Sequence, residues 1–164
     1  MSRFCSRLRR ACATGHSLRM LVNLTPVDTH DSVTAMAESY AQKAVAAART
    51  LNAQLDFSEA SLMALETILD RAARQPEGHD LNENCKMWGS YLGEVVRRRF
   101  GGDWSIETYP GKQFATLTLS VQGSKLFPSM KIHRRLTAGE ADNVWSFYQM
   151  IKARLESQPG GKVQ

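Results

Sequence analysis

The sequence DWSIETYPGKQFATLTLSV, residues 103–121, decides the fold class. On both sides of Pro110-Gly111, a dipeptide typical of turns, apolar residues alternate with polar ones. This period of two predicts an antiparallel hairpin with one apolar face. A turn at Gln122-Gly123 leads to an expected short third strand over residues 125–127. Because a two-stranded ribbon is only marginally stable alone, we expect helices to cover its apolar face.

The segments around the hairpin have a helical period instead. Apolar residues recur every three or four positions over residues 32–53, from residue 58 to the Pro76 stop, and over residues 80–101. Residues 128–136 fit a short helix or a strand, and we favour the helix because Pro128 suits a first helical position. Thr137 and Glu140 form a capping box that predicts the start of a last helix.

The order of these elements predicts an α+β fold. Three N-terminal helices precede a short antiparallel sheet of two or three strands, and a C-terminal helix follows it. The strands are grouped together and no parallel βαβ unit is present, which favours α+β over α/β. Gly89 and Gly93 lie one turn apart on the third helix, and each costs about 1 kcal/mol of helix propensity relative to Ala. We therefore expect another backbone to pack closely there.

The net charge of +5 comes from 21 basic and 16 acidic residues, and it belongs to the N-terminus. Residues 1–27 contain five arginines and no acidic residue, so the remainder of the chain is neutral. Composition alone therefore does not support nucleic-acid binding. We interpret residues 1–27 as a basic, disordered leader, with a transit peptide as the alternative, residues 28–158 as one domain, and residues 159–164 as a flexible tail.

The remaining composition excludes several classes of protein. With 43% hydrophobic and 23% charged residues, the chain is an ordinary globular domain, and no window approaches the roughly 18 consecutive apolar residues of a membrane span. The three cysteines, Cys5, Cys12 and Cys85, form no CxxC pair, so neither a disulfide framework nor a structural metal site is expected. We expect no cofactor. The cytoplasm is the simplest compartment, or an organelle if the leader is a transit peptide.

Charge within the domain is strongly segregated. Residues 28–85 hold ten acidic and four basic residues, whereas residues 86–135 hold nine basic and three acidic ones. If the two basic clusters of the second segment meet, they form a surface for an acidic protein, a phosphate or a nucleic-acid backbone. The same cations are equally suited to pairing with the acidic segment, and the helix dipole alone explains the first cluster. The candidate binding residues are Arg97, Arg98, Arg99, Lys131, His133, Arg134 and Arg135.

Signals for catalysis are weaker. Glu94 lies in a mostly apolar helix and is a candidate acid or base with a raised pKa. Its spacing to Arg97 and Arg98 is also that of an ordinary helical ion pair, which we favour. No HExxH, GxSxG, P-loop or GxGxxG motif is present.

Three short motifs stand out in the sequence, a Leu-Asp-x-Ser-x-x-Ser-Leu helix start at residues 55–62, Tyr-Leu-Gly-Glu-Val at 91–95 and Gly-Gly-x-Trp at 101–104. Together they resemble the motifs of a group of small uncharacterised bacterial α+β domains. The resemblance covers about residues 50–155. It implies a compact α+β domain but carries no established activity, and some members are similar in size to immunity proteins that neutralise secreted toxins.

The leading functional hypothesis is a non-enzymatic bacterial protein-binding domain, such as an immunity or accessory protein. Its basic surface would bind an acidic surface of a partner protein, with no membrane involved. The alternative is a nucleic-acid or phosphate-ligand binder that uses Arg97–Arg99 and Lys131–Arg135, and a second alternative is an enzyme with Glu94 as its acid or base. The sequence does not predict the oligomeric state.

Overall fold

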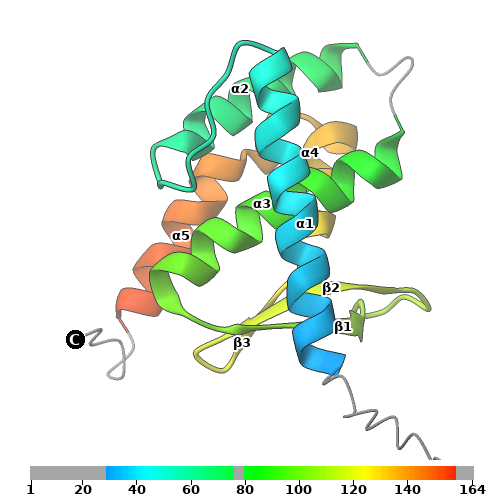
Figure 1. Ribbon diagram of the computed structural model, residues 1–164, viewed down its shortest axis with the longest axis vertical. Helices are drawn as coiled ribbons and strands as arrows, with labels where there is room; N and C mark the ends of the chain where they lie inside the picture. The colour runs from blue at the N-terminus through cyan, green and yellow to red at the C-terminus, as the bar shows by residue number, and fades with distance from the viewer. Residues whose placement is uncertain (1–28, 76–79, 158–164) are drawn as a thin grey trace, which may run out of the picture.

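The computed structural model describes residues 29–75 and 80–157, which form an α+β domain, as predicted. Three helices precede a three-stranded sheet, and two further helices follow it (Figure 1). The expected leader and tail lie outside the described residues. The elements are α1 (Thr29–Thr50), α2 (Ser61–Arg74), α3 (Leu81–Phe100), β1 (Asp103–Thr108), β2 (Ala115–Val121), β3 (Ser124–Leu126), α4 (Pro128–Ala138), the short 3₁₀ helix η1 (Glu140–Asp142) and α5 (Val144–Glu156).

The sheet is antiparallel in the order β1-β2-β3, and it lies at one end of the helices, where α1 crosses it (Figure 1). The predicted strands are confirmed within one residue at each end. Trp104 pairs with Leu119 and Ile106 pairs with Leu117, so these four side chains share one face. Trp104 and Leu119 are fully buried beneath the helices. The apolar face of the hairpin is thus covered at this end of the sheet.

The two glycines of α3 allow the close packing that their spacing predicted. A Cβ atom on Gly89 would lie 2.6 Å from Cα of Ser129, so the backbone of α4 passes directly against this position. A Cβ atom on Gly93 would overlap the indole ring of Trp104. The first contact is the backbone approach that we expected, whereas the second accommodates a large side chain.

The end of the chain differs in one respect from the prediction. Residues 128–138 form helix α4, but Thr137 and Glu140 do not begin the next helix. Thr137 lies in the last turn of α4, where its hydroxyl donates to the carbonyl of His133 at 2.8 Å. The chain leaves α4 at Gly139, whose φ is +89°, and passes through η1. Helix α5 is instead capped by Asn143, whose side-chain oxygen accepts from the Ser146 N–H at 3.0 Å.

Candidate functional site

The first predicted cluster, Arg97 to Arg99, occupies the last turn of α3, and each of its members has an acidic partner. Arg97 donates from Nε to Glu94 at 2.7 Å and from Nη2 to Glu38 of α1 at 2.5 Å. Arg98 lies 3.4 Å from Glu94, and its guanidinium stacks 3.6 Å from the centre of the Phe57 ring.

Arg99 completes this cluster on the side of α5. It lies 3.5 Å from Glu59 and 3.8 Å from Glu156. The charge of Arg97–Arg99 is therefore largely compensated within the domain, and the three arginines connect α3 to α1, α5 and the loop before α2.

Glu94 is fully buried and has the geometry of a structural ion pair. Its carboxylate accepts from Arg97 and, at 2.8 Å, from Nε1 of Trp104. Burial raises the pKa of this carboxyl, but the hydrogen bonds from Arg97 and Trp104 outweigh it and hold the pKa below its usual range. The helical ion pair that we favoured from the spacing is confirmed. Sealed and ionised, Glu94 is not placed to exchange a proton with a ligand.

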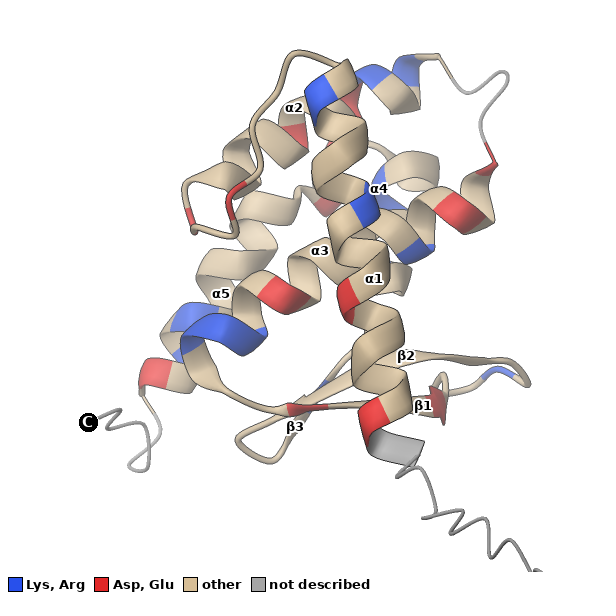
Figure 2. Ribbon diagram, viewed as in Figure 1, with Lys and Arg blue, Asp and Glu red and all other residues tan. Residues whose placement is uncertain are grey.

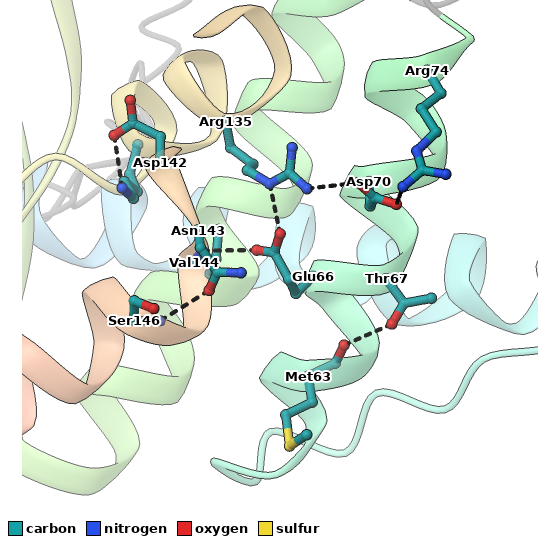
Figure 3. A network of polar contacts seen from close by, with 11 residues as sticks. Met63, Glu66, Thr67, Asp70, Arg74, Arg135, Asp142, Asn143, Val144 and Ser146 are labelled. Atoms are coloured by element: carbon teal, nitrogen blue, oxygen red, sulfur yellow. Dashed lines mark hydrogen bonds and ion pairs between the residues drawn. The ribbon is translucent and has the colours of Figure 1, made fainter. Parts of the chain in front are cut away.

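The second predicted cluster is also paired internally. Lys131 donates to Asp142 at 2.8 Å, and Arg134 lies 3.4 Å from the same carboxylate. Arg135 is only 2% exposed, which corrects its expected role as a surface binding residue. It donates to Glu66 at 2.6 Å and to Asp70 at 3.1 Å, both on α2 (Figure 3).

Glu66 joins three helices through this network. Its second carboxylate oxygen accepts from the N–H of Val144 at 2.7 Å, so it binds the first turn of α5 as well as Arg135 of α4 (Figure 3). Unsatisfied N–H groups at a helix start and a buried guanidinium both require an acceptor, and Glu66 supplies one to each. Glu66 and Arg135 thus together connect α2, α4 and α5.

The two basic clusters do not meet in one surface. The last turn of α3 lies beside α5 and away from α4 (Figure 2). His133 of α4 instead lines a groove together with residues from the first turns of α3. The expected joint surface of residues 97–99 and 131–135 is therefore absent from the described part of the chain.

A groove of about 670 Å³ opens on the side of the molecule between the hairpin and the N-terminal parts of α1 and α3. Residues of five helices and strands and of one turn form its walls. They are Met36 and Tyr40 of α1, Leu81, Asn82, Cys85 and Lys86 of α3, Ile106 of β1, Lys112 and Phe114 of the β1–β2 turn, Ala115, Thr116 and Leu117 of β2, and Ser129, Met130 and His133 of α4.

More than half of the exposed large apolar side chains among the described residues line this groove. The described residues include seven exposed large apolar side chains, and four of them, Met36, Leu81, Ile106 and Phe114, line it. Ile106 is 53% exposed although it shares a face with the fully buried Trp104. The helices thus cover one end of the apolar face of the sheet and leave the other end open.

The charged groups in the walls of the groove are all basic or potentially basic, namely Lys86, Lys112 and His133. Residues 86–135 contain nine lysines and arginines, and seven of them lie within 4 Å of a carboxylate. The other two are Lys86 and Lys112, which have no acidic partner among the described residues. Internal pairing therefore uses most of the predicted basic segment, and the cations left over line the groove.

Cys85 lines the groove but is buried. Burial raises the pKa of its thiol to about 11. The thiol is therefore neutral at physiological pH and is a poor nucleophile or metal ligand.

His133 is the one predicted site residue that belongs to the groove, and the other lining residues were missed. Some of them, such as Met36 and Ile106, occupy apolar stripe positions, which normally indicate core, and Lys86 and Lys112 belong to the predicted basic segment. Among residues 29–75 and 80–157, no group of three or more metal-ligating side chains occurs. None of the helices in those ranges combines the length and the apolar character that crossing a membrane requires.

No protein-family model matches the chain, and neither a curated protein nor a solved structure matches it.

Proposed function

We propose that this chain is a non-enzymatic protein-binding domain whose docking surface is the groove between the hairpin, α1, α3 and α4. The observation that carries the proposal is the gathering of Met36, Leu81, Ile106 and Phe114 in one hollow. These side chains are exposed in the isolated chain, and a partner that covers them would gain the free energy of removing apolar surface from water. An immunity or accessory protein, the kind of binding domain that we favour, would act through such a surface.

The exposure of the walls favours a protein segment over a small molecule. Pockets for small ligands enclose most of the ligand surface, which requires walls that close around it. Here Ile106 is 53% exposed and Phe114 is 44% exposed, so the hollow is shallow on the hairpin side. An extended or helical segment of a partner can lie across such a surface and cover both side chains.

Nucleic-acid or phosphate binding, the alternative, has less support. A protein that binds a nucleic-acid backbone neutralises several phosphates with free lysines and arginines. Arg97–Arg99 and Lys131, Arg134 and Arg135 are already paired with carboxylates of the same domain. The groove itself adds two unpaired lysines and a largely apolar lining.

Site-specific photo-crosslinking in the native cell tests the proposal. We would place a photoreactive benzoyl-phenylalanine at Phe114 in the groove and, as a matched control, at Met150, an α5 residue that is 62% exposed outside it. We expect a discrete adduct from position 114 and none of the same mass from position 150. The captured protein, produced separately, should then bind the domain stoichiometrically, and Ile106→Glu should weaken this complex.

Two results would contradict the proposal. One is that the same adducts form from both positions, which indicates non-specific contact. The other is that the captured protein binds the Ile106→Glu variant as tightly as the native domain. A nucleic-acid adduct at position 114 would favour the alternative.

A further inference from the structure

We infer that the partner segment in the groove is acidic, with carboxylates flanking its apolar residues, and that Lys86 and Lys112 select it. This inference rests on the proposed docking function and specifies its ligand. The two lysines come from different walls, Lys86 from α3 and Lys112 from the β1–β2 turn. Neither has a carboxylate within ion-pair distance among the described residues, in contrast to the other seven lysines and arginines of residues 86–135.

The acidic residues closest in sequence to Lys86 are already engaged. The carboxylate of Asp80 caps α3 by accepting from the N–H groups of Asn82 and Glu83, at 2.9 and 3.1 Å. The carboxylate of Glu83 lies 3.7 Å from Lys43 of α1. No acidic side chain belongs to the described lining of the groove. Among the described residues, no carboxylate therefore pairs with the positive charge of the groove, and this charge attracts carboxylates and repels cations.

The arrangement of apolar and basic groups also specifies the pattern of the ligand. Met36, Ile106 and Phe114 offer contacts to apolar side chains, and Lys86 and Lys112 line the same groove from two different elements. Lysines can pack their aliphatic stems on apolar surface while the ammonium group stays in water. A segment with apolar residues in its middle and Asp or Glu on both sides matches both features.

Two synthetic peptides test this inference directly on the full chain. Both carry the same central leucine and phenylalanine residues, and they differ only in the flanking residues, which are glutamates in one peptide and lysines in the other. Binding is followed by NMR of the methionine methyl groups. Met36 and Met130 line the groove, whereas Met63 and Met150 are exposed elsewhere and serve as internal controls.

We expect the glutamate peptide to shift the methyl signals of Met36 and Met130 and to leave those of Met63 and Met150 unchanged. Its affinity should exceed that of the lysine peptide by about tenfold, and this difference should shrink with added salt. The double variant Lys86→Glu/Lys112→Glu should reverse the preference. The matched control, Arg49→Glu/Arg154→Glu, changes two exposed cations outside the groove. This variant should still prefer the glutamate peptide.

The outcomes separate the inference from the function on which it rests. If both peptides shift Met36 and Met130 with equal affinity, or if the lysine peptide binds more tightly, the charge selection is wrong and the docking surface stands. If neither peptide shifts these signals at millimolar concentration, the docking surface is wrong too. Shifts of the same methyl groups on dilution without peptide would identify a second copy of the chain as the occupant and would overturn the acidic partner.

Discussion

Arg135 donates a hydrogen bond of 2.6 Å from Nε to Glu66, 69 residues earlier in the chain, and is only 2% exposed. The same guanidinium reaches Asp70, while Glu66 also accepts from the first turn of α5. From the sequence alone, Arg135 looks available to bind a ligand. In the folded chain it is the centre of an internal network. Removing one partner of such a pair leaves the other charge poorly compensated.

Arg135→Ala should therefore destabilise the domain by about 3 kcal/mol, because Glu66 and Asp70 lose their shared cation. Its neighbour Arg134 is the matched control, since it is exposed and lies 3.4 Å from Asp142. Arg134→Ala should cost at most about 1 kcal/mol. Urea denaturation of the three proteins measures the difference. Equal free energies of unfolding for the two variants would show that the Arg135 network does not stabilise the domain more than the exposed Arg134 ion pair does.

Glu94 makes the stability of the domain depend on pH in the acid range. The pKa of Glu94 is below its ordinary value of 4.5 in the folded chain, because the hydrogen bonds from Arg97 and Trp104 outweigh the effect of burial. The unfolded state therefore takes up a proton first as the pH falls. The stabilisation that ionised Glu94 contributes is complete above pH 4.5, and it is lost as the pH falls through the lower pKa of the folded state.

The variant Glu94→Gln should reduce stability at neutral pH and should flatten the loss of stability below pH 4.5. Denaturation midpoints over a series of pH values measure both effects. Glu140→Gln is the control, because Glu140 is exposed and has no ion-pair partner among the described residues. A native-like slope in the Glu94→Gln protein would assign the acid sensitivity to other carboxylates.

Gly93→Ala should destabilise the domain by about 1 to 3 kcal/mol, although alanine is the better helix former. The reason is that the new methyl group would overlap the outer ring of the Trp104 indole. Trp104→Phe removes that part of the ring, so the cost of Gly93→Ala should shrink in this background. A double-mutant cycle measured by thermal unfolding gives the coupling. Additive effects would mean that Trp104 is not the obstacle.

Local patterns predicted what local forces determine. The alternation over residues 103–121 predicted the hairpin because the side chains of a strand alternate between faces wherever the strand lies. The spacing of Gly89 and Gly93 predicted close packing because residues four positions apart lie on the same face of a helix. Whether Arg135 faces solvent depends on carboxylates 65 and 69 residues away. The sequence therefore left external binding and internal pairing open, and only the folded chain decides between them.

Local sequence patterns could not predict the groove, for a related reason. Met36 and Ile106 belong to apolar stripes that also contain buried residues such as Ala37 and Trp104, and no local feature marks where the covering helices stop. Lys86 and Lys112 likewise become distinctive only after the partners of the other basic residues are known. To identify these two lysines as binding residues, one must know the whole ion-pair network and not only their sequence neighbours.

The thiol of Cys85 should react slowly with alkylating reagents at neutral pH. Burial raises its pKa to about 11, and the thiolate is the reactive form. In a Cys5→Ser/Cys12→Ser protein, which keeps only Cys85, the alkylation rate should rise about tenfold per pH unit up to the highest pH at which the domain stays folded. The urea-unfolded protein provides the reference rate. A plateau of the native rate near pH 8.5 would indicate an ordinary, exposed thiol.

Substitutions on the apolar face of the hairpin should distinguish an exposed groove position from a core position by their effects on the free energy of unfolding. Ile106 and Leu117 are cross-strand partners, yet Ile106 is 53% exposed and Leu117 is buried. We expect Leu117→Ala to cost about 2 to 4 kcal/mol, whereas Ile106→Thr, which keeps a β-branched side chain, should cost about 0.5 kcal/mol or less. Chemical denaturation checks both values. A large cost for Ile106→Thr would mean that Ile106 is packed in the free domain, and the apolar wall offered to a partner would then be smaller.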